Sequence, residues 1–173
     1  MSSIIRLIRD KMRGIPKDVP LDYSQITDNI YIGAWPTKYH RDTIISLGVT
    51  LIVATILESA DKELNEPPLQ LVHTRATDLG SRLIYPTGQI LKGVNAAVSA
   101  IGNGRKVMVY CKAGRHRSAT MTACILVGLG HPADEAIAIV RAGRDEVHIN
   151  ATHSEAIHKF EQTWKARQAD SSI

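Results

Sequence analysis

The segment VMVYCKAGRHRSAT, residues 107–120, places one cysteine among several basic side chains. The thiol belongs to Cys111, and the four basic residues that follow it within six positions are Lys112, Arg115, His116 and Arg117. Basic side chains held this close together repel one another, and a turn with a purely structural role gains nothing in return. A site that holds a doubly negative ligand against a thiolate does gain from them. The residue types therefore predict an anion site beside a reactive cysteine.

The flanking residues predict the elements that hold this cysteine in place. Lys106–Tyr110 has the length and composition of a strand, and Ser118–Leu129 is an apolar helix closed by Gly130. Ligands of α/β proteins bind at the carboxyl ends of strands, where turn N–H groups and a helix N-terminus favour anions. The same surroundings lower the pKa of a thiol. The residues expected to bind the anion are Lys112, Ala113, Gly114, Arg115, His116 and Arg117.

Cysteine and arginine stand here in the spacing Cys-x5-Arg, followed by the hydroxyl of Ser118. The segment resembles the cysteine-dependent protein tyrosine and dual-specificity phosphatase superfamily, from about Ile30 to Trp164. Its wording, CKAGRHRSATM, is most similar to the branch of the mitochondrial-type phosphatidylglycerophosphate phosphatase, and CKAG also recurs in phosphoinositide phosphatases. The resemblance implies catalysis without metal or cofactor, with Cys111 attacking phosphorus, Arg117 holding the phosphate oxygens and Ser118 stabilising the departing thiolate.

Tyr110 departs from the family pattern, which usually has a histidine immediately before the cysteine. In the family that histidine belongs to the network that steadies the thiolate. Because the other features of the loop are present, we expect Cys111 to titrate below a free thiol even with Tyr110 in that position.

The resemblance also implies a general acid, since the superfamily takes an aspartate from a loop before the long helix that precedes the cysteine strand. Asp78, in RATDLGS at residues 75–81, has this position and is the expected acid in the first step and base in the second. A turn or capping aspartate is the alternative interpretation. Asp61, in a polar loop, and Asp145, after the cysteine helix, rank lower.

Strands alternating with helices predict an α/β domain with a mostly parallel central sheet and helices on both faces. Val49–Ala54 is a continuous β-branched run typical of a buried strand, and apolar residues recur at helical spacing after Pro86. The other expected strands are Ile30–Ile32 and Leu69–His73, and the other expected helices are Tyr39–Leu47, a helix beginning at Pro132, and Thr152–Arg167.

Composition predicts one globular domain in a reducing compartment, which we expect to be the cytoplasm. The 173 residues are 44% apolar and include two cysteines, of which Cys124 lies within an apolar helix and is expected to pack in the core. No apolar run approaches the length of a membrane span. One phenylalanine and two tryptophans offer few platforms for bases, so nucleic acid is not an expected partner.

Residues 1–20 form a basic segment ahead of the catalytic domain, expected at 21–168, and a short tail at 169–173. Residues 1–13 predict a helix with isoleucines on one face and arginines elsewhere. Packing of this helix on the domain is the first interpretation, peripheral contact with an anionic membrane is the second, and a cleavable presequence is the third.

The expected substrate is a phosphomonoester, either on a phosphorylated protein or in the headgroup of an anionic phospholipid. Lys112, Arg115 and His116 suit both, because either carries further negative charge. Two other classes remain as alternatives: a phosphate-binding module without turnover, and a sulfurtransferase, which would need neither Asp78 nor Ser118. His148, His153 and His158 stand five residues apart, so their directions diverge on a helix and we expect solvated or capping roles rather than a metal site.

Overall fold

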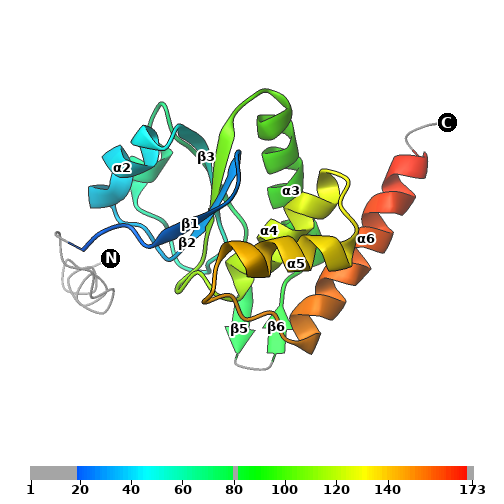
Figure 1. Ribbon diagram of the computed structural model, residues 1–173. Helices are drawn as coiled ribbons and strands as arrows, with labels where there is room; N and C mark the ends of the chain where they lie inside the picture. The colour runs from blue at the N-terminus through cyan, green and yellow to red at the C-terminus, as the bar shows by residue number, and fades with distance from the viewer. Residues whose placement is uncertain (1–18, 80–81, 171–173) are drawn as a thin grey trace.

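A five-stranded sheet runs through the molecule in the order β1-β2-β7-β3-β4 (Figure 1). The computed structural model describes residues 19–79 and 82–170. The strands are β1 (Tyr23–Thr27), β2 (Ile30–Gly33), β3 (Val49–Ala54), β4 (Gln70–His73) and β7 (Lys106–Tyr110). Strands β2, β7, β3 and β4 are parallel, and β1 pairs antiparallel with β2 at one edge. The prediction of a mostly parallel sheet is confirmed.

Strand β7 occupies the centre because its side chains are apolar on both faces. Val107 and Val109 belong to one apolar cluster, whereas Met108 and Tyr110 belong to the other, as the two-residue period of a strand requires. All four side chains are fully buried. The central strand thereby fixes the position at which the chain turns into residue 111.

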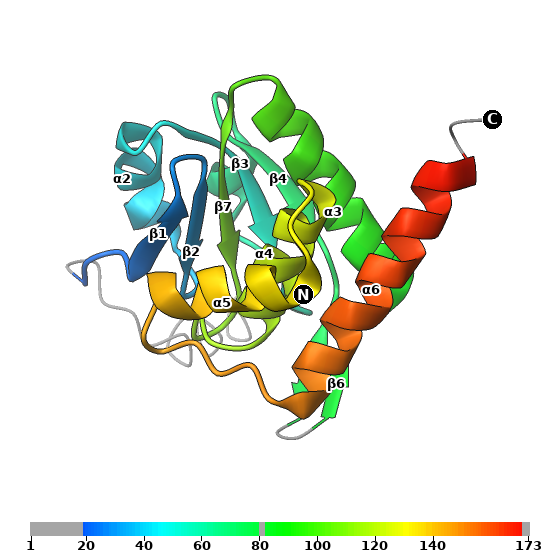
Figure 2. The same ribbon diagram turned by 45° about the vertical axis from the view of Figure 1, so that its right-hand side comes forward.

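Helices cover both faces of the sheet, as predicted. One face carries α3 (Thr87–Gly102), α4 (Arg117–Gly128), α5 (Ala133–Gly143) and α6 (Ala151–Asp170), and the other carries α2 (Arg41–Ser46) with the short 3-10 helices η1 (Lys38–His40) and η2 (Lys62–Asn65). Figure 2 shows α4 lying behind α5, between the sheet and α6. This helix packs against α3, α5 and α6, and its residues from Ser118 to Val127 are all buried.

Two elements differ from the sequence-based expectations. Strand β1 was not predicted: its pattern YSQIT is partly exposed and lacks the apolar run that marks the buried strands. Residues 75–81, expected as a loop, contain β5 (Thr77–Leu79), which pairs antiparallel with β6 (Arg82–Ile84). Figure 1 shows this hairpin projecting from the domain near the start of α6.

The predicted helix over residues 1–13, and with it the predicted membrane contact, lies outside the described residues. At the other end α6 continues to Asp170. None of the helices in the described ranges is both long enough and apolar enough to cross a bilayer.

Candidate active site

The loop from Cys111 to Arg117 connects the end of β7 to the first turn of α4. Gly114 lies at its middle with a left-handed φ of +66°, which turns the chain back toward the helix. The last loop residue before the helix, His116, accepts hydrogen bonds at its carbonyl from the backbone and hydroxyl of Thr120. A strand end, a left-handed glycine and a helix N-terminus thus meet in this loop, an arrangement that favours anions in other proteins.

The Cys111 thiol is 3% exposed and lies at the base of this loop. Its Sγ is 3.2 Å from Oγ of Ser118, a buried residue in the first turn of α4. Burial works to raise the pKa of the thiol, but hydrogen bonds from the Ser118 hydroxyl and from the backbone N–H groups of Ser118 and Ala113, with the charge of Arg117, outweigh it. The net result is a pKa below the ordinary value for cysteine.

Arg117 is the first residue of α4, half-buried, and donates from Nη1 to the carbonyl of Ala76 at 3.3 Å. Ala76 immediately precedes β5, the strand that carries Asp78. The arginine is therefore anchored beside the segment that the sequence assigned to the general acid.

Asp78 lies in β5, opposite Leu83 of β6. The structure describes its backbone position and not its side chain, so its role as acid stays a prediction. The two lower-ranked aspartates occupy other surroundings: Asp61 accepts a hydrogen bond from the backbone N–H of Lys38 at 2.9 Å, and Asp145 is exposed just after α5.

The remaining loop residues divide into exposed and covered positions. Lys112, Ala113 and Arg115 are exposed, whereas Gly114 is buried and His116 is half-buried. Lys112 and Arg115 therefore present positive charge to solvent at the rim of the loop, where a ligand carrying more than one anionic group would meet it.

Sequence reasoning did not find the groups that hold the carbonyls of the loop. Tyr110 O accepts from both N (2.8 Å) and Oγ1 (2.7 Å) of Thr55. The carbonyl of Lys112 accepts from Trp35 N, that of Gly114 from Nε of Arg144, and that of Arg115 from the backbone N–H of His148. These donors come from distant parts of the chain, and no local pattern marks them.

The catalytic-domain model of the dual specificity phosphatases matches residues 30–163, which is more than half of the chain. The chain belongs to this family. It is a cysteine-dependent phosphatase, and the superfamily resemblance seen in the sequence is confirmed.

The relatives of this dual specificity phosphatase include one named for both a lipid and protein-tyrosine phosphatase activity and another named as a dual specificity phosphatase. It is 35% identical over 154 residues to phosphatidylglycerophosphatase and protein-tyrosine phosphatase 1 of Rattus norvegicus, covering 85% of this chain and 80% of the relative. Dual specificity phosphatase 28 of Mus musculus is 25% identical over 158 residues, covering 89% and 93%. A crystal structure of PTPMT1 superimposes with a TM-score of 0.76 at 25% identity, covering 86% of this chain and 99% of that one.

Two of the three histidines at positions 148, 153 and 158 lie against the ring of His116 in the phosphatase. The His116 ring lies with its centroid 5.6 Å from that of His148 and 5.3 Å from that of His153. His153 is fully buried, not solvated, and its backbone N–H and ring Nδ1 pair reciprocally with Asn150 at the start of α6, so the capping role holds for this residue. Within the described ranges, no group of three or more His, Cys, Asp or Glu residues is arranged to hold a metal ion.

Cys124 lies in the middle of α4 and is fully buried, as predicted for a core residue. Burial raises the pKa of its thiol, whereas the hydrogen bonds at Cys111 leave the pKa of that thiol lowered. Both cysteines of the phosphatase are free thiols. The pKa values of the two thiols are thus shifted in opposite directions, and the lowered pKa belongs to the cysteine in the loop.

Proposed function

We propose that Cys111 is the nucleophile and that hydrolysis proceeds through a phosphocysteine. The observation that carries this proposal is a buried thiol with a lowered pKa at the base of a loop whose backbone carbonyls accept hydrogen bonds from other parts of the chain. Such a site favours both the thiolate and the anion that it attacks.

In the first step the Cys111 thiolate forms a bond to phosphorus while the bond from phosphorus to the substrate oxygen breaks. Asp78 donates its proton to that departing oxygen, so the product leaves as an alcohol rather than an alkoxide. Arg117, with the loop N–H groups, holds the phosphoryl oxygens throughout the transfer.

The second step releases phosphate. Asp78, now a carboxylate, takes a proton from water, whose oxygen bonds to phosphorus as the bond to sulfur breaks. The sulfur leaves as a thiolate and the Ser118 hydroxyl, 3.2 Å away, stabilises it by hydrogen bonding. The enzyme returns to its starting state without a metal ion or cofactor taking part.

We further propose an anionic phospholipid with a terminal phosphomonoester as the substrate. The headgroup of phosphatidylglycerophosphate carries a second, diester phosphate, which the positive charges of the exposed Lys112 and Arg115 would attract. The rat relative, 35% identical, includes this lipid in its name. That name also includes protein-tyrosine phosphatase activity, so a phosphotyrosine protein is the second candidate.

The test is phosphate release from phosphatidylglycerophosphate in mixed micelles and from a phosphotyrosine peptide, with Cys111→Ser as the blank. We expect the lipid to be preferred by more than about tenfold in kcat/KM. Charge reversal of Lys112 and Arg115 to glutamate should then reduce lipid turnover more than peptide turnover. A preference for the peptide would identify a protein phosphatase, and release from neither substrate would contradict the enzymatic proposal itself.

Peripheral membrane contact through residues 1–13 is consistent with this substrate. The support is the sequence alone, in which the predicted basic helix has isoleucines on one face and arginines elsewhere. Sedimentation with anionic vesicles, comparing the full chain with a chain that starts at Ile15, would test this contact. Equal sedimentation of the two would contradict it.

A further inference from the structure

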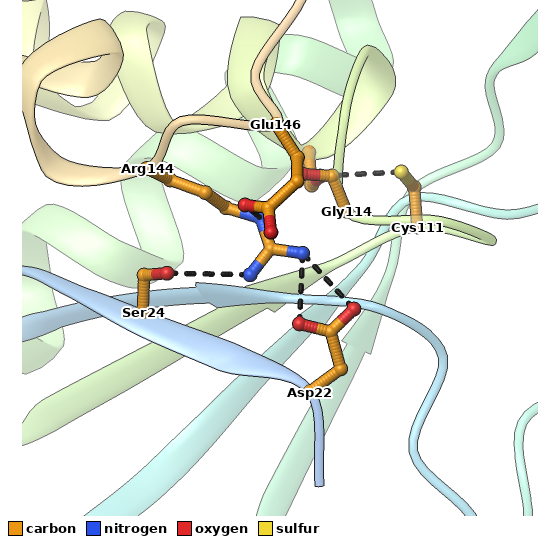
Figure 3. A network of polar contacts seen from close by, with 7 residues as sticks. Asp22, Ser24, Cys111, Gly114, Arg144 and Glu146 are labelled. Atoms are coloured by element: carbon orange, nitrogen blue, oxygen red, sulfur yellow. Dashed lines mark hydrogen bonds and ion pairs between the residues drawn. The ribbon is translucent and has the colours of Figure 1, made fainter.

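Arg144 follows α5 and is an arginine whose side chain is 2% exposed. Figure 3 shows its guanidinium lying between Asp22 and Ser24 on one side and the loop at Gly114 on the other. Nη2 contacts both carboxylate oxygens of Asp22, at 2.8 and 3.0 Å, and Nη1 donates to Ser24 Oγ at 3.3 Å. Nε donates to the carbonyl of Gly114 at 3.1 Å, and Glu146 Oε2 is 3.6 Å from the same nitrogen.

The contact between Arg144 and the Gly114 carbonyl also fixes the direction of the Arg115 N–H. In a planar trans peptide the C=O and the N–H point in opposite directions. The carbonyl of Gly114 shares its peptide with the N–H of Arg115, so a carbonyl held by Arg144 directs that N–H away from Arg144.

An earlier peptide of the same loop, between Lys112 and Ala113, shows which group an N–H faces when its carbonyl is held from outside the loop. Its carbonyl accepts from Trp35 N at 3.4 Å, while its N–H, that of Ala113, bonds to the sulfur of Cys111. A carbonyl fixed from outside therefore accompanies an N–H directed at the reacting centre. The peptide of Arg115 and His116 is held similarly, because its carbonyl accepts from His148 N at 3.1 Å.

We propose that Arg144 is a positioning residue that holds the Arg115 N–H toward the bound phosphoryl group. It acts through the Gly114 peptide and touches neither the substrate nor Cys111. The proposal rests on the proposed function, since it assigns a role in the same phosphate site.

Gly114 is the loop position that most needs such a contact. A glycine backbone accepts many φ and ψ values, so the peptide after it rotates more readily than its neighbours. If this peptide rotated, the carbonyl would face the anion and repel it, and one N–H donor would be lost. Asp22 holds Arg144 against this, because its carboxylate, together with that of Glu146, pairs with the buried charge of the guanidinium.

A general loosening of the loop would change both its affinity for oxyanions and the pKa of the Cys111 thiol, whereas loss of Arg144 should change only the first. The pKa of the Cys111 thiol is lowered by hydrogen bonds from residues 113 and 118 and by the charge of Arg117, whereas Arg144 bonds to the loop at the carbonyl of Gly114. Loss of Arg144 should therefore weaken oxyanion binding while leaving the ionisation of the thiol unchanged.

The experiment measures both properties in full-length Arg144→Met and Arg144→Lys. Oxyanion affinity is read from tungstate, by competitive inhibition of aryl phosphate hydrolysis and by calorimetry. Thiol ionisation is read from the pH profile of alkylation by iodoacetate. Arg105→Met is the matched control: Arg105 also ties two segments together, through Nε to Thr50 Oγ1 at 2.9 Å and Nη2 to Thr50 O at 3.0 Å, but it lies at the opposite ends of the strands from the loop.

We expect Arg144→Met to weaken tungstate binding by about tenfold or more, with the alkylation midpoint unmoved. Arg144→Lys should not restore affinity, since one ammonium lacks the fork that spans Gly114 and Asp22. Arg105→Met should match the wild type in both assays.

Two results would overturn the proposal. One is tungstate affinity within about twofold of wild type in both Arg144 variants. The other is a loss of affinity of about tenfold accompanied by a shift of the alkylation midpoint of about one pH unit. If Arg144→Met does not fold, Arg144→Lys alone carries the comparison. If the wild type hydrolyses no phosphate ester, the proposed function fails, whereas calorimetry of tungstate binding still decides the role of Arg144.

Discussion

Replacing Gly114 by alanine is expected to destabilise the protein and to impair turnover, for two separable reasons. The first is the backbone: a φ of +66° is a left-handed conformation, which costs a residue with a Cβ about 1–2 kcal/mol. The second is space: an added Cβ would lie 2.7 Å from the carbonyl carbon of Gly33 and 2.9 Å from the nitrogen of Ala34. Both are backbone atoms at the end of β2, so neither can rotate aside.

Backbone movement sets the size of the second effect. The Ala34 N–H donates to the carbonyl of Asp22 at 3.0 Å, so a shift of β2 away from the loop also disturbs the start of β1. Overpacking of this kind costs about 1–3 kcal/mol. The total of about 2–5 kcal/mol is large against the roughly 5–15 kcal/mol stability of a typical domain. If the loop moves instead, the phosphate site is displaced, and a misplacement near 1 Å can cost about 10²-fold in rate.

Gly104→Ala is the matched control because it isolates the first reason. Gly104 has a φ of +73°, but an added Cβ there meets no atom within 4 Å. We expect urea denaturation to show a loss of about 1–2 kcal/mol for Gly104→Ala with unchanged kcat/KM, and a larger loss with about 10²-fold lower kcat/KM for Gly114→Ala. Equal stability and equal activity in the two variants would refute the reasoning.

Two further substitutions test the chemistry. Ser118→Ala removes a hydrogen bond that lowers the pKa of the Cys111 thiol, so the alkylation profile with iodoacetate should move to higher pH; an unmoved midpoint would count against that hydrogen bond. The sign follows because iodoacetate reacts with the thiolate, and the hydroxyl stabilises only that form. Asp78→Asn should lower kcat for an alkyl phosphate by about 10²–10⁴-fold, and much less for an aryl phosphate with a good leaving group. Unchanged turnover of the alkyl ester would show that another group is the acid.

The sequence predicted best those elements whose positions depend on their own residues. Strands β3 and β7 have the predicted bounds, because strands buried on both faces are made of nearly continuous apolar runs. Strand β1 was missed because it lies at the sheet edge, where one face is partly exposed and YSQIT carries no strong pattern. Its register depends on β2, the one strand that pairs with it in the described part of the chain.

The sequence around Asp78 carries a local signal for a hairpin. Short segments containing Thr77 and Ile84 flank the dipeptide Gly80–Ser81, and a two-residue connection with glycine first is typical of a β-hairpin. The family pattern indicated which aspartate along the chain is the expected acid. Pairing of Thr77 with Ile84 gives it a place on a strand instead of in a loop.

The contacts around the loop follow from a requirement that no short motif can meet. An anion cradle directs several N–H groups to one point, so the carbonyls of the same peptides face away and need donors of their own once buried. In a seven-residue loop the N–H groups that face the anion cannot also donate to the carbonyls of the same loop, so those donors must belong to other parts of the chain. They come from Trp35 after β2, from Thr55 after β3, and from Arg144 and His148 between α5 and α6.

Nucleophile and arginine are therefore visible in Cys-x5-Arg, whereas the geometry that makes them effective depends on the whole fold. Thr55 lies 55 residues before the carbonyl it holds, and Arg144 lies 30 residues after its own and 122 from Asp22. Since each donor is fixed by a different element, a substitution far from the loop can weaken phosphate binding without touching either motif residue. Activity in this family member should accordingly be more sensitive to the residues that hold the loop carbonyls than to the exposed side chains of the loop itself.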